Sequence, residues 1–183
     1  MNKVFLFLAT GFEEIEAVAT IDVLLRGEVD VVTVSITGNT LVKGAHGISV
    51  KADKLFEEVD FEEGTMLILP GGMPGASNLS AHEGLKNIIL KYSSENKYLA
   101  AICAAPFVYG ELGILNGKKA TCYPSFEPRL IGAVLSEETV VQDGKIITGK
   151  GPGFAVDFGL KIVEELQGGV QSNKVAQGLL TKK

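Results

Sequence analysis

One stretch of this sequence, Lys97 to Val108, constrains the fold more than any other. A strand-length apolar run ends at Cys103, and Pro106 follows where the first turn of a helix accepts proline. Alanines on both sides of the cysteine leave room for neighbouring backbone to pass close by. The stretch therefore predicts a sharp strand-to-helix turn at Cys103, with the geometry of a nucleophile elbow.

Two interpretations of Cys103 follow from this stretch. At the start of a helix, the positive end of the helix dipole favours thiolate over thiol, which would make Cys103 a nucleophile at neutral pH. Alternatively, Cys103 packs as a small buried hydrophobe, since free cysteine is among the most buried residue types. The stretch by itself leaves both interpretations open.

The composition is that of a folded globular protein, and it argues against several classes of function. Apolar residues make up 46% of the chain and charged residues 21%. A net charge of −5 without a basic run argues against a nucleic-acid partner. No apolar run reaches the roughly 18 residues of a membrane span, so we expect no membrane partner. Cys103 and Cys122 are too few for a secreted disulfide framework, which predicts a reducing, cytoplasmic location.

Apolar runs alternate with helix-periodic segments along the chain. Strands are predicted at 3–9, 29–36, 66–69 and 97–102, and helices at 13–26, 81–96, from the elbow to about residue 112, and at 154–166. Hairpins are predicted at 39–52 and 139–148, and a last polar helix or tail after 169. We therefore expect a single α/β domain over 1–183, with a mostly parallel sheet between helices and a small β-hairpin excursion.

In such a fold ligands bind at the carboxyl ends of the strands, where loops 10–16, 70–75 and 103–106 would meet. The glycine-rich loop 70–75 is either a tight structural turn or a source of bare backbone N–H groups for a ligand. It matches no phosphate-binding motif. Glu13 and Glu14 are explained by the helix dipole, whereas Glu16 lies near the buried side and needs a partner or a raised pKa.

Four motifs carry a family resemblance, in family order across nearly the whole chain: Gly11 to Glu16, Leu69 to Gly72, Ala100 to Pro106, and Gly151 to Gly153. On these motifs the chain resembles the ThiJ/PfpI superfamily, in particular the branch of the parkinsonism-associated deglycase and its bacterial relatives. The resemblance implies a flavodoxin-like three-layer sandwich and a homodimer.

The resemblance also implies roles for individual residues. Cys103 would be the nucleophile and Glu16 its partner carboxyl, acting in general acid–base catalysis. The backbone N–H of Ala104 and Gly72 would form an oxyanion pocket, and we group Gly71 with them as an oxyanion or substrate-binding residue.

The sequence departs from the family pattern near the cysteine. Tyr123 stands where many members have a histidine, and we place it in the substrate pocket. His46, at the predicted hairpin tip, matches a position that approaches the active site of the other subunit in relatives; it is either a pocket residue or a plain turn residue. Without a histidine beside Cys103 a protease triad has no base, so peptidase activity is disfavoured. Cys122 is interpreted as structural, with a role as resolving thiol left open.

The leading hypothesis is a cofactor-independent enzyme that acts on reactive aldehydes and dicarbonyls. Its substrate would be free methylglyoxal, converted to lactate, or the equivalent adducts on glycated proteins. Cys103 would add to the aldehyde, Glu16 would move the proton between carbons, and backbone donors would hold the oxyanion. We expect no metal, because the two histidines and two cysteines form no ligand pattern.

A second hypothesis belongs to another class: a redox-sensing or chaperone-like stress protein, in which Cys103 oxidises to a sulfinate held by Glu16 without turnover. Product formation from methylglyoxal separates the two hypotheses. A thiamine-biosynthesis role, suggested by the family's historical name, finds no phosphate or thiazole site in the sequence.

Overall fold

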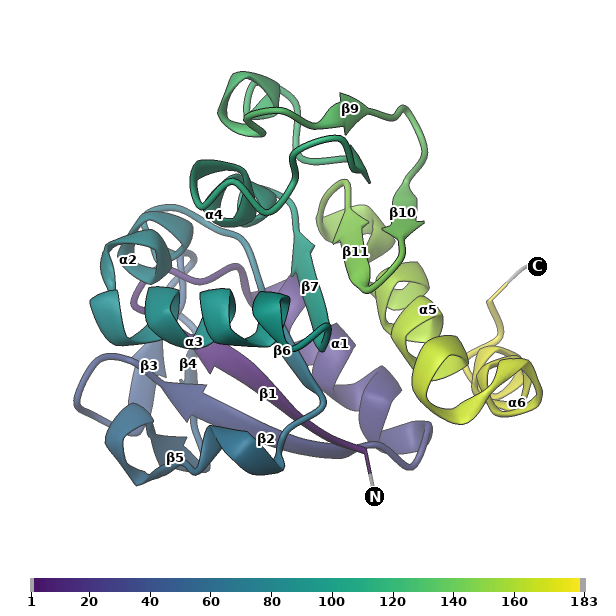
Figure 1. Cartoon of the computed structure of the whole chain (residues 1–183). Helices are drawn as coiled ribbons and strands as arrows, with labels where there is room; N and C mark the ends of the chain where they lie inside the picture. Colours follow the sequence, from purple (N-terminus) through teal and green to yellow (C-terminus); the bar gives the residue numbers. More distant parts are fainter. Residues whose placement is uncertain (1, 182–183) are drawn as a thin grey trace.

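A mostly parallel sheet forms the middle layer of the computed structural model, which describes residues 2–181 (Figure 1). Within this range the sheet has seven strands: β10 (Val140–Asp143), β11 (Ile146–Gly149), β7 (Tyr98–Ile102), β6 (Met66–Leu69), β1 (Lys3–Leu8), β2 (Asp30–Ser35) and β5 (Lys54–Leu55), in that spatial order. All neighbouring pairs are parallel except β10 and β11, which form the predicted antiparallel hairpin. The architecture is the expected α/β flavodoxin-like fold.

Helices cover both faces of the sheet (Figure 1). Their bounds are α1 (Glu14–Arg26), α2 (Gly75–Ala81), α3 (Glu83–Ser94), α4 (Pro106–Glu111), α5 (Ala155–Gln167) and α6 (Gly169–Gly178). Strand β1 shows why two cores form, because alternate side chains of a strand point to opposite faces. Phe5 and Phe7 pack with the α2, α3 and α4 side, whereas Val4, Leu6 and Leu8 pack with α1, α5 and α6.

Two small pairs of strands lie outside this sheet, one antiparallel and one parallel. Strands β3 (Leu41–Lys43) and β4 (Ser49–Lys51) form the predicted hairpin excursion, with His46 in the turn. Strands β8 (Lys119–Ala120) and β9 (Val134–Leu135) pair in parallel and were not predicted. Short 3-10 turns occur at Phe56–Glu58, Phe61–Glu63, Glu127–Arg129 and Pro152–Phe154.

The structure differs from the sequence prediction mainly around the glycine-rich loop. Helix α2 begins at Gly75, directly after that loop, and His82 separates it from α3 by accepting the Leu85 N–H at its ring nitrogen Nδ1 (3.0 Å). The single helix predicted at 81–96 is therefore preceded by a second, shorter one. Along residues 2–181, no helix combines the length and the apolar character needed to cross a bilayer.

Candidate active site

Cys103 lies on the turn between β7 and α4, as predicted. Its φ of +65° is in the left-handed region, which a residue with a side chain rarely adopts. Neighbouring backbone holds it there: the Cys103 N–H donates to the Gly149 carbonyl (2.9 Å), and the Cys103 carbonyl accepts from the Tyr123 N–H (2.8 Å). The side chain is nearly buried, with the residue 8% exposed. The strained turn places the sulfur at the carboxyl edge of the sheet, where ligands bind in this fold.

Glu16, near the start of α1, is fully buried beside the cysteine. Its Oε2 accepts the Gly71 N–H at 2.7 Å. Gly71 fits between the two side chains only because it lacks one: a Cβ there would lie 2.7 Å from both the Cys103 Cβ and the Glu16 Oε2. The structure thus brings Cys103 and Glu16 together around Gly71. The Gly71 N–H donates to Glu16, so it does not donate to an oxyanion. Gly71 therefore positions the Glu16 carboxyl, which corrects our grouping of Gly71 with the oxyanion donors.

Burial changes the proton affinity of both partners. It raises the pKa of Glu16 from 4.5 to about 7; the Glu13 charge adds to the increase, whereas hydrogen bonds from the Cys103 thiol and Gly71 oppose it. Burial likewise raises the pKa of the Cys103 thiol, and the Glu16 charge and hydrogen bond raise it further. Near neutral pH Glu16 is therefore present both as the carboxylate and as the carboxylic acid, as acid–base catalysis requires.

The start of the helix is not the dominant influence on the pKa of Cys103. The Ala104 and Gly72 N–H groups do lower the pKa of Cys103, but burial and the neighbouring carboxyl outweigh them. Helix α4 is also only six residues long, so few peptide dipoles align behind the sulfur. A thiolate in this site needs a base, and Glu16 is the carboxyl in contact with the thiol.

The two N–H groups predicted for the oxyanion pocket both lie at the sulfur, since both influence its pKa. Gly72 has a φ of +87°, and a Cβ there would lie 2.4 Å from the Glu13 nitrogen. A side chain would therefore displace either α1 or the loop that carries this donor. The arrangement can stabilise negative charge next to Cys103 through backbone donors that are already oriented.

His46 is held by Glu14 rather than by the cysteine. Its backbone N–H donates to Glu14 Oε1 (2.7 Å) and its Nδ1 lies 2.8 Å from Glu14 Oε2, while the imidazole is mostly exposed. The Ile48 N–H reaches the same Oε1 at 3.3 Å. Glu14 thus fastens the β3–β4 turn to α1, a contact between distant segments that the helix-dipole explanation of Glu14 missed. Within the described chain His46 is bonded to Glu14 in the β3–β4 turn, and its place in the pocket of a second subunit stays a prediction.

Glu13 was also missed as a contributor to the site. Its Oε2 accepts the Glu16 N–H (2.7 Å), and its own N–H donates to the Gly71 carbonyl (2.9 Å). Glu13, Glu14 and His46 place potential metal-ligand atoms within 4.8 Å of one another in the described part of the chain. The Glu14 oxygens in this cluster already accept N–H groups of the hairpin, so its observed bonds are those of a structural clamp.

The second cysteine lies on the opposite side of the sheet. Cys122 packs in the core beneath α3 and α4, whereas Cys103 belongs to the core beneath α1 and α5. Both thiols are free. The next residue, Tyr123, returns to the active-site edge through its hydrogen bond to Cys103. The packing favours the structural interpretation of Cys122.

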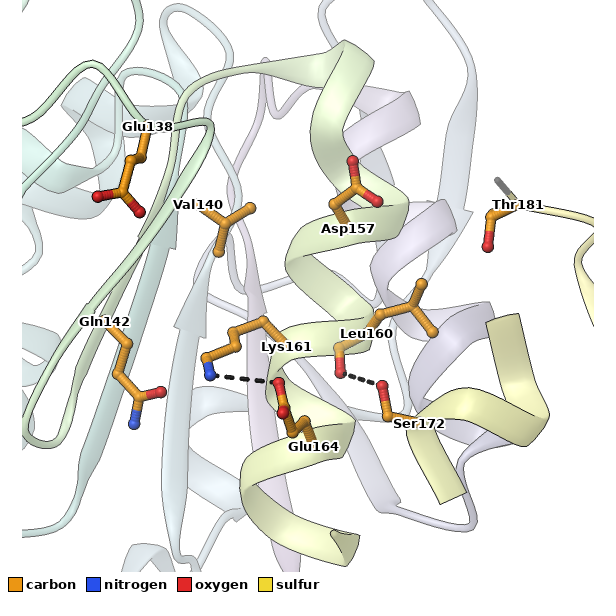
Figure 2. Close-up of a pocket in the computed structure, with 9 residues that line it drawn as sticks. All are labelled: Glu138, Val140, Gln142, Asp157, Leu160, Lys161, Glu164, Ser172 and Thr181. Carbon is orange, nitrogen blue, oxygen red and sulfur yellow. Dashed lines mark hydrogen bonds and ion pairs between the residues drawn. The ribbon is translucent and has the colours of Figure 1, made fainter. Parts of the chain in front are cut away.

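Another hollow lies away from these residues. It has a volume of about 500 Å³ between β10, α5 and α6, and Figure 2 shows the residues that line it. Lys161 there pairs with Glu164 (3.2 Å), and the Ser172 hydroxyl donates to the Leu160 carbonyl (2.9 Å). None of the predicted site residues lines it.

Fold and site together define a flavodoxin-like α/β protein with a buried cysteine–carboxyl pair at the carboxyl edge of its sheet. The pattern of the DJ-1/PfpI family matches residues 2–165, and the chain belongs to this family. The crystal structure described as Toxoplasma gondii DJ-1, oxidized, is similar over 100% of both chains, with a TM-score of 0.96 and 37% identity.

Two curated relatives show the range of lengths in the family. The chain is 38% identical to protein DJ-1 homolog B of Arabidopsis thaliana over 99% of its length, but this covers only 42% of the plant protein. It is 32% identical to a Caenorhabditis elegans protein named glutathione-independent glyoxalase DJR-1.2, over 93% of this chain and 91% of that one. The chain thus spans less than half of the first relative and nearly all of the second.

Proposed function

We propose that the protein is a cofactor-independent glyoxalase, or a deglycase of the same chemistry, with Cys103 as nucleophile and Glu16 as acid and base. The observation that carries this proposal is the Cys103–Gly71–Glu16 arrangement, in which a carboxyl with a pKa of about 7 contacts a thiol beside two backbone donors. The name of the Caenorhabditis elegans relative supports the choice of reaction.

The reaction begins with addition of sulfur to the aldehyde carbon of a dicarbonyl. As the C–S bond forms, the Glu16 carboxylate accepts the thiol proton, and the carbonyl π electrons become the charge of an alkoxide. The N–H groups of Gly72 and Ala104 stabilise that charge. Return of the proton from Glu16 to the alkoxide gives a neutral hemithioacetal on Cys103.

The remaining steps move two protons and add one water. The Glu16 carboxylate removes the proton from the former aldehyde carbon, and the electron pair forms an enediolate whose charge lies on the oxygen of the neighbouring ketone. Glu16 returns its proton to the second carbon, and the hydroxyl proton on the first carbon passes to the second oxygen, which leaves a hydroxyacyl thioester on Cys103. Water attacks the thioester, the C–S bond breaks, and the thiol takes back a proton as a hydroxy acid leaves. Methylglyoxal plus water gives lactate, without an external oxidant or reductant.

Incubation of the purified protein with methylglyoxal tests this function directly. We expect lactate to accumulate in molar excess over the protein, measured by NMR in the absence of glutathione. Consumption of methylglyoxal that stops at one equivalent per chain, or Cys103 oxidation without lactate, would exclude the enzyme and favour the redox sensor. The burial of Cys103 and the raised pKa of its thiol weigh against the sensor, because sensing cysteines are usually exposed and acidic.

The pH dependence of thiol reactivity tests the role of Glu16. In a Cys122→Ala background, alkylation of Cys103 by iodoacetamide should rise through a pH of about 7, because Glu16 becomes a base there. Glu16→Gln should move the rise to alkaline pH, since an amide cannot accept the thiol proton while burial still raises the pKa of Cys103. Mass spectrometry at several pH values gives the rates. Identical profiles in both variants would contradict the pairing.

Dimerisation is the second part of the proposal. Helix α1 exposes an apolar stripe of Ile15, Val18 and Leu25, each 47% to 58% exposed. The adjoining hairpin adds Leu41 and Ile48, and the Glu14 clamp joins the two elements. We infer that a second copy of the chain covers this surface, because contiguous exposed apolar residues are rare on monomers.

Val18→Lys should dissociate this dimer, because two-fold symmetry introduces the charge twice into one interface. The matched control is Leu90→Lys on α3, which changes a comparably exposed leucine (44%) on the opposite side of the sheet. Sedimentation velocity should give a dimer for wild type and the control and a monomer for Val18→Lys. A monomeric wild type would refute the proposed interface.

A further inference from the structure

A second hollow lies at the active-site edge of the sheet, and no step of the proposed reaction uses it. It has a volume of about 310 Å³ and is lined by Tyr123, Pro124 and residues 150–154. The aromatic rings of Tyr123 and Phe154, the prolines and two glycines make its lining largely carbon. Its one charged group, Lys150, directs its Nζ to the Glu137 carboxylate at 3.1 Å. The hollow therefore suits an uncharged, apolar group.

Tyr123 differs from the other tyrosines of the chain. The hydroxyls of Tyr92, Tyr98 and Tyr109 donate to Phe61, Glu165 and Ala100 respectively. The Tyr123 hydroxyl makes no hydrogen bond to the described residues, and the residue is 46% exposed. Its ring lies instead against Gly151, where an added Cβ would be 3.2 Å from the ring atom Cδ2. The partly exposed ring thus forms one wall of the hollow.

Both walls of the hollow are connected to the nucleophile by backbone hydrogen bonds. The Tyr123 N–H donates to the Cys103 carbonyl (2.8 Å), and the Cys103 N–H donates to the carbonyl of Gly149 (2.9 Å), one residue before Lys150. Two hydrogen bonds of the Cys103 backbone thus fix both walls relative to the nucleophile. The methyl group of methylglyoxal is too small to fill 310 Å³, whereas a flat ring would contact Tyr123 and Pro152 together.

We propose that this hollow is the subsite for the substituent of the aldehyde substrate, and that Tyr123 makes it selective for flat aromatic substituents. The inference rests on the proposed function, because it assumes that the substrate reacts at Cys103. It assigns Tyr123 a specificity-determining role through its ring face, with no proton transfer by the phenol.

The specificity ratio tests the subsite. We expect wild type to have a higher kcat/KM for phenylglyoxal than for methylglyoxal. Tyr123→Ala should lower the ratio about tenfold, through KM for phenylglyoxal. Tyr123→Phe should retain the ratio, because it keeps the ring and removes only the hydroxyl. Turnover of both substrates with a ratio that Tyr123→Ala does not change would overturn the proposal.

Alkylation separates failure of the subsite from failure of the proposed function. In a Cys122→Ala background, Cys103 displaces bromide from phenacyl bromide or iodide from iodoacetamide, forming a C–S bond and releasing the thiol proton. The subsite predicts a phenacyl preference that Tyr123→Ala reduces and Tyr123→Phe retains, even if neither dicarbonyl is turned over. A phenacyl preference that is absent, or that survives Tyr123→Ala, would overturn the subsite whatever the enzyme assay shows.

Discussion

Cys103→Ser will lower the turnover of methylglyoxal by roughly 10³-fold or more, because a serine hydroxyl in this site is far less nucleophilic than the thiol. The Glu16 carboxyl, with a pKa of about 7, is matched to a thiol and far too weak a base for an alcohol. Serine keeps the size of the side chain and the strained turn, so the fold should persist. Assays of lactate formation measure the loss of turnover, and circular dichroism of the same samples shows whether the fold persists.

Cys122→Ala is the matched control for this experiment. Cys122 is also buried and free, but it packs in the core on the other face of the sheet. It should lose some stability through a smaller side chain and keep its turnover within a few fold. If Cys103→Ser retained a tenth of the wild-type rate, or Cys122→Ala lost activity while folded, the nucleophile would be misassigned.

Much of the fold could be predicted from the sequence because its strands are buried on both faces. Continuous apolar runs such as 66–69 indicate such strands, and Asp143-Gly144 indicates the β10–β11 turn. The elbow followed from the alanines around Cys103 and the proline after it, and the positive φ of Cys103 agrees with it. Local chemistry decides these elements, so local sequence predicts them.

The parts that were missed depend on contacts between distant segments. The two-residue strand β5 exists because β2 offers a pairing edge, and its sequence carries no signal of its own. The Glu14 clamp needs the 44–48 turn to meet α1, which only the tertiary structure determines. The raised pKa of Cys103 reflects burial, which a motif does not reveal. The single domain and the cytoplasmic location stay predictions.

The proton affinity of Glu16 also links the site to stability. A carboxyl whose pKa is about 7 in the folded chain and 4.5 in the unfolded chain favours unfolding once the pH exceeds the lower value, since the unfolded state gives up its proton first. This cost grows from a pH of about 4.5 to about 7 and then stays constant. By 1.36 kcal/mol per pKa unit it reaches about 3 kcal/mol. The buried Glu16 carboxyl is therefore kept at the expense of stability.

Glu16→Gln should separate these two roles. The amide oxygen can still accept the Gly71 N–H, whereas no proton can be moved, so turnover should fall about 10²- to 10⁴-fold. The free energy of unfolding should match that of wild type near a pH of 4 and exceed it by about 3 kcal/mol at a pH of 8. Urea unfolding across this pH range measures the difference. A variant less stable than wild type at a pH of 8 would mean that Glu16 is not held as a high-pKa acid.

Glu14→Gln is the control with the opposite expected sign, two residues away on the same helix. Burial raises the pKa of Glu14, but the hydrogen bonds from His46 and Ile48 together bring it below its ordinary value. The ionised carboxylate therefore stabilises the fold above a pH of about 4.5, and that contribution is lost as the pH falls through the lowered value. Glu14→Gln should be less stable than wild type at a pH of 8, with a difference that shrinks in acid. Opposite pH trends in the two variants would show that helix α1 carries one carboxyl that stabilises the fold when ionised and another that destabilises it.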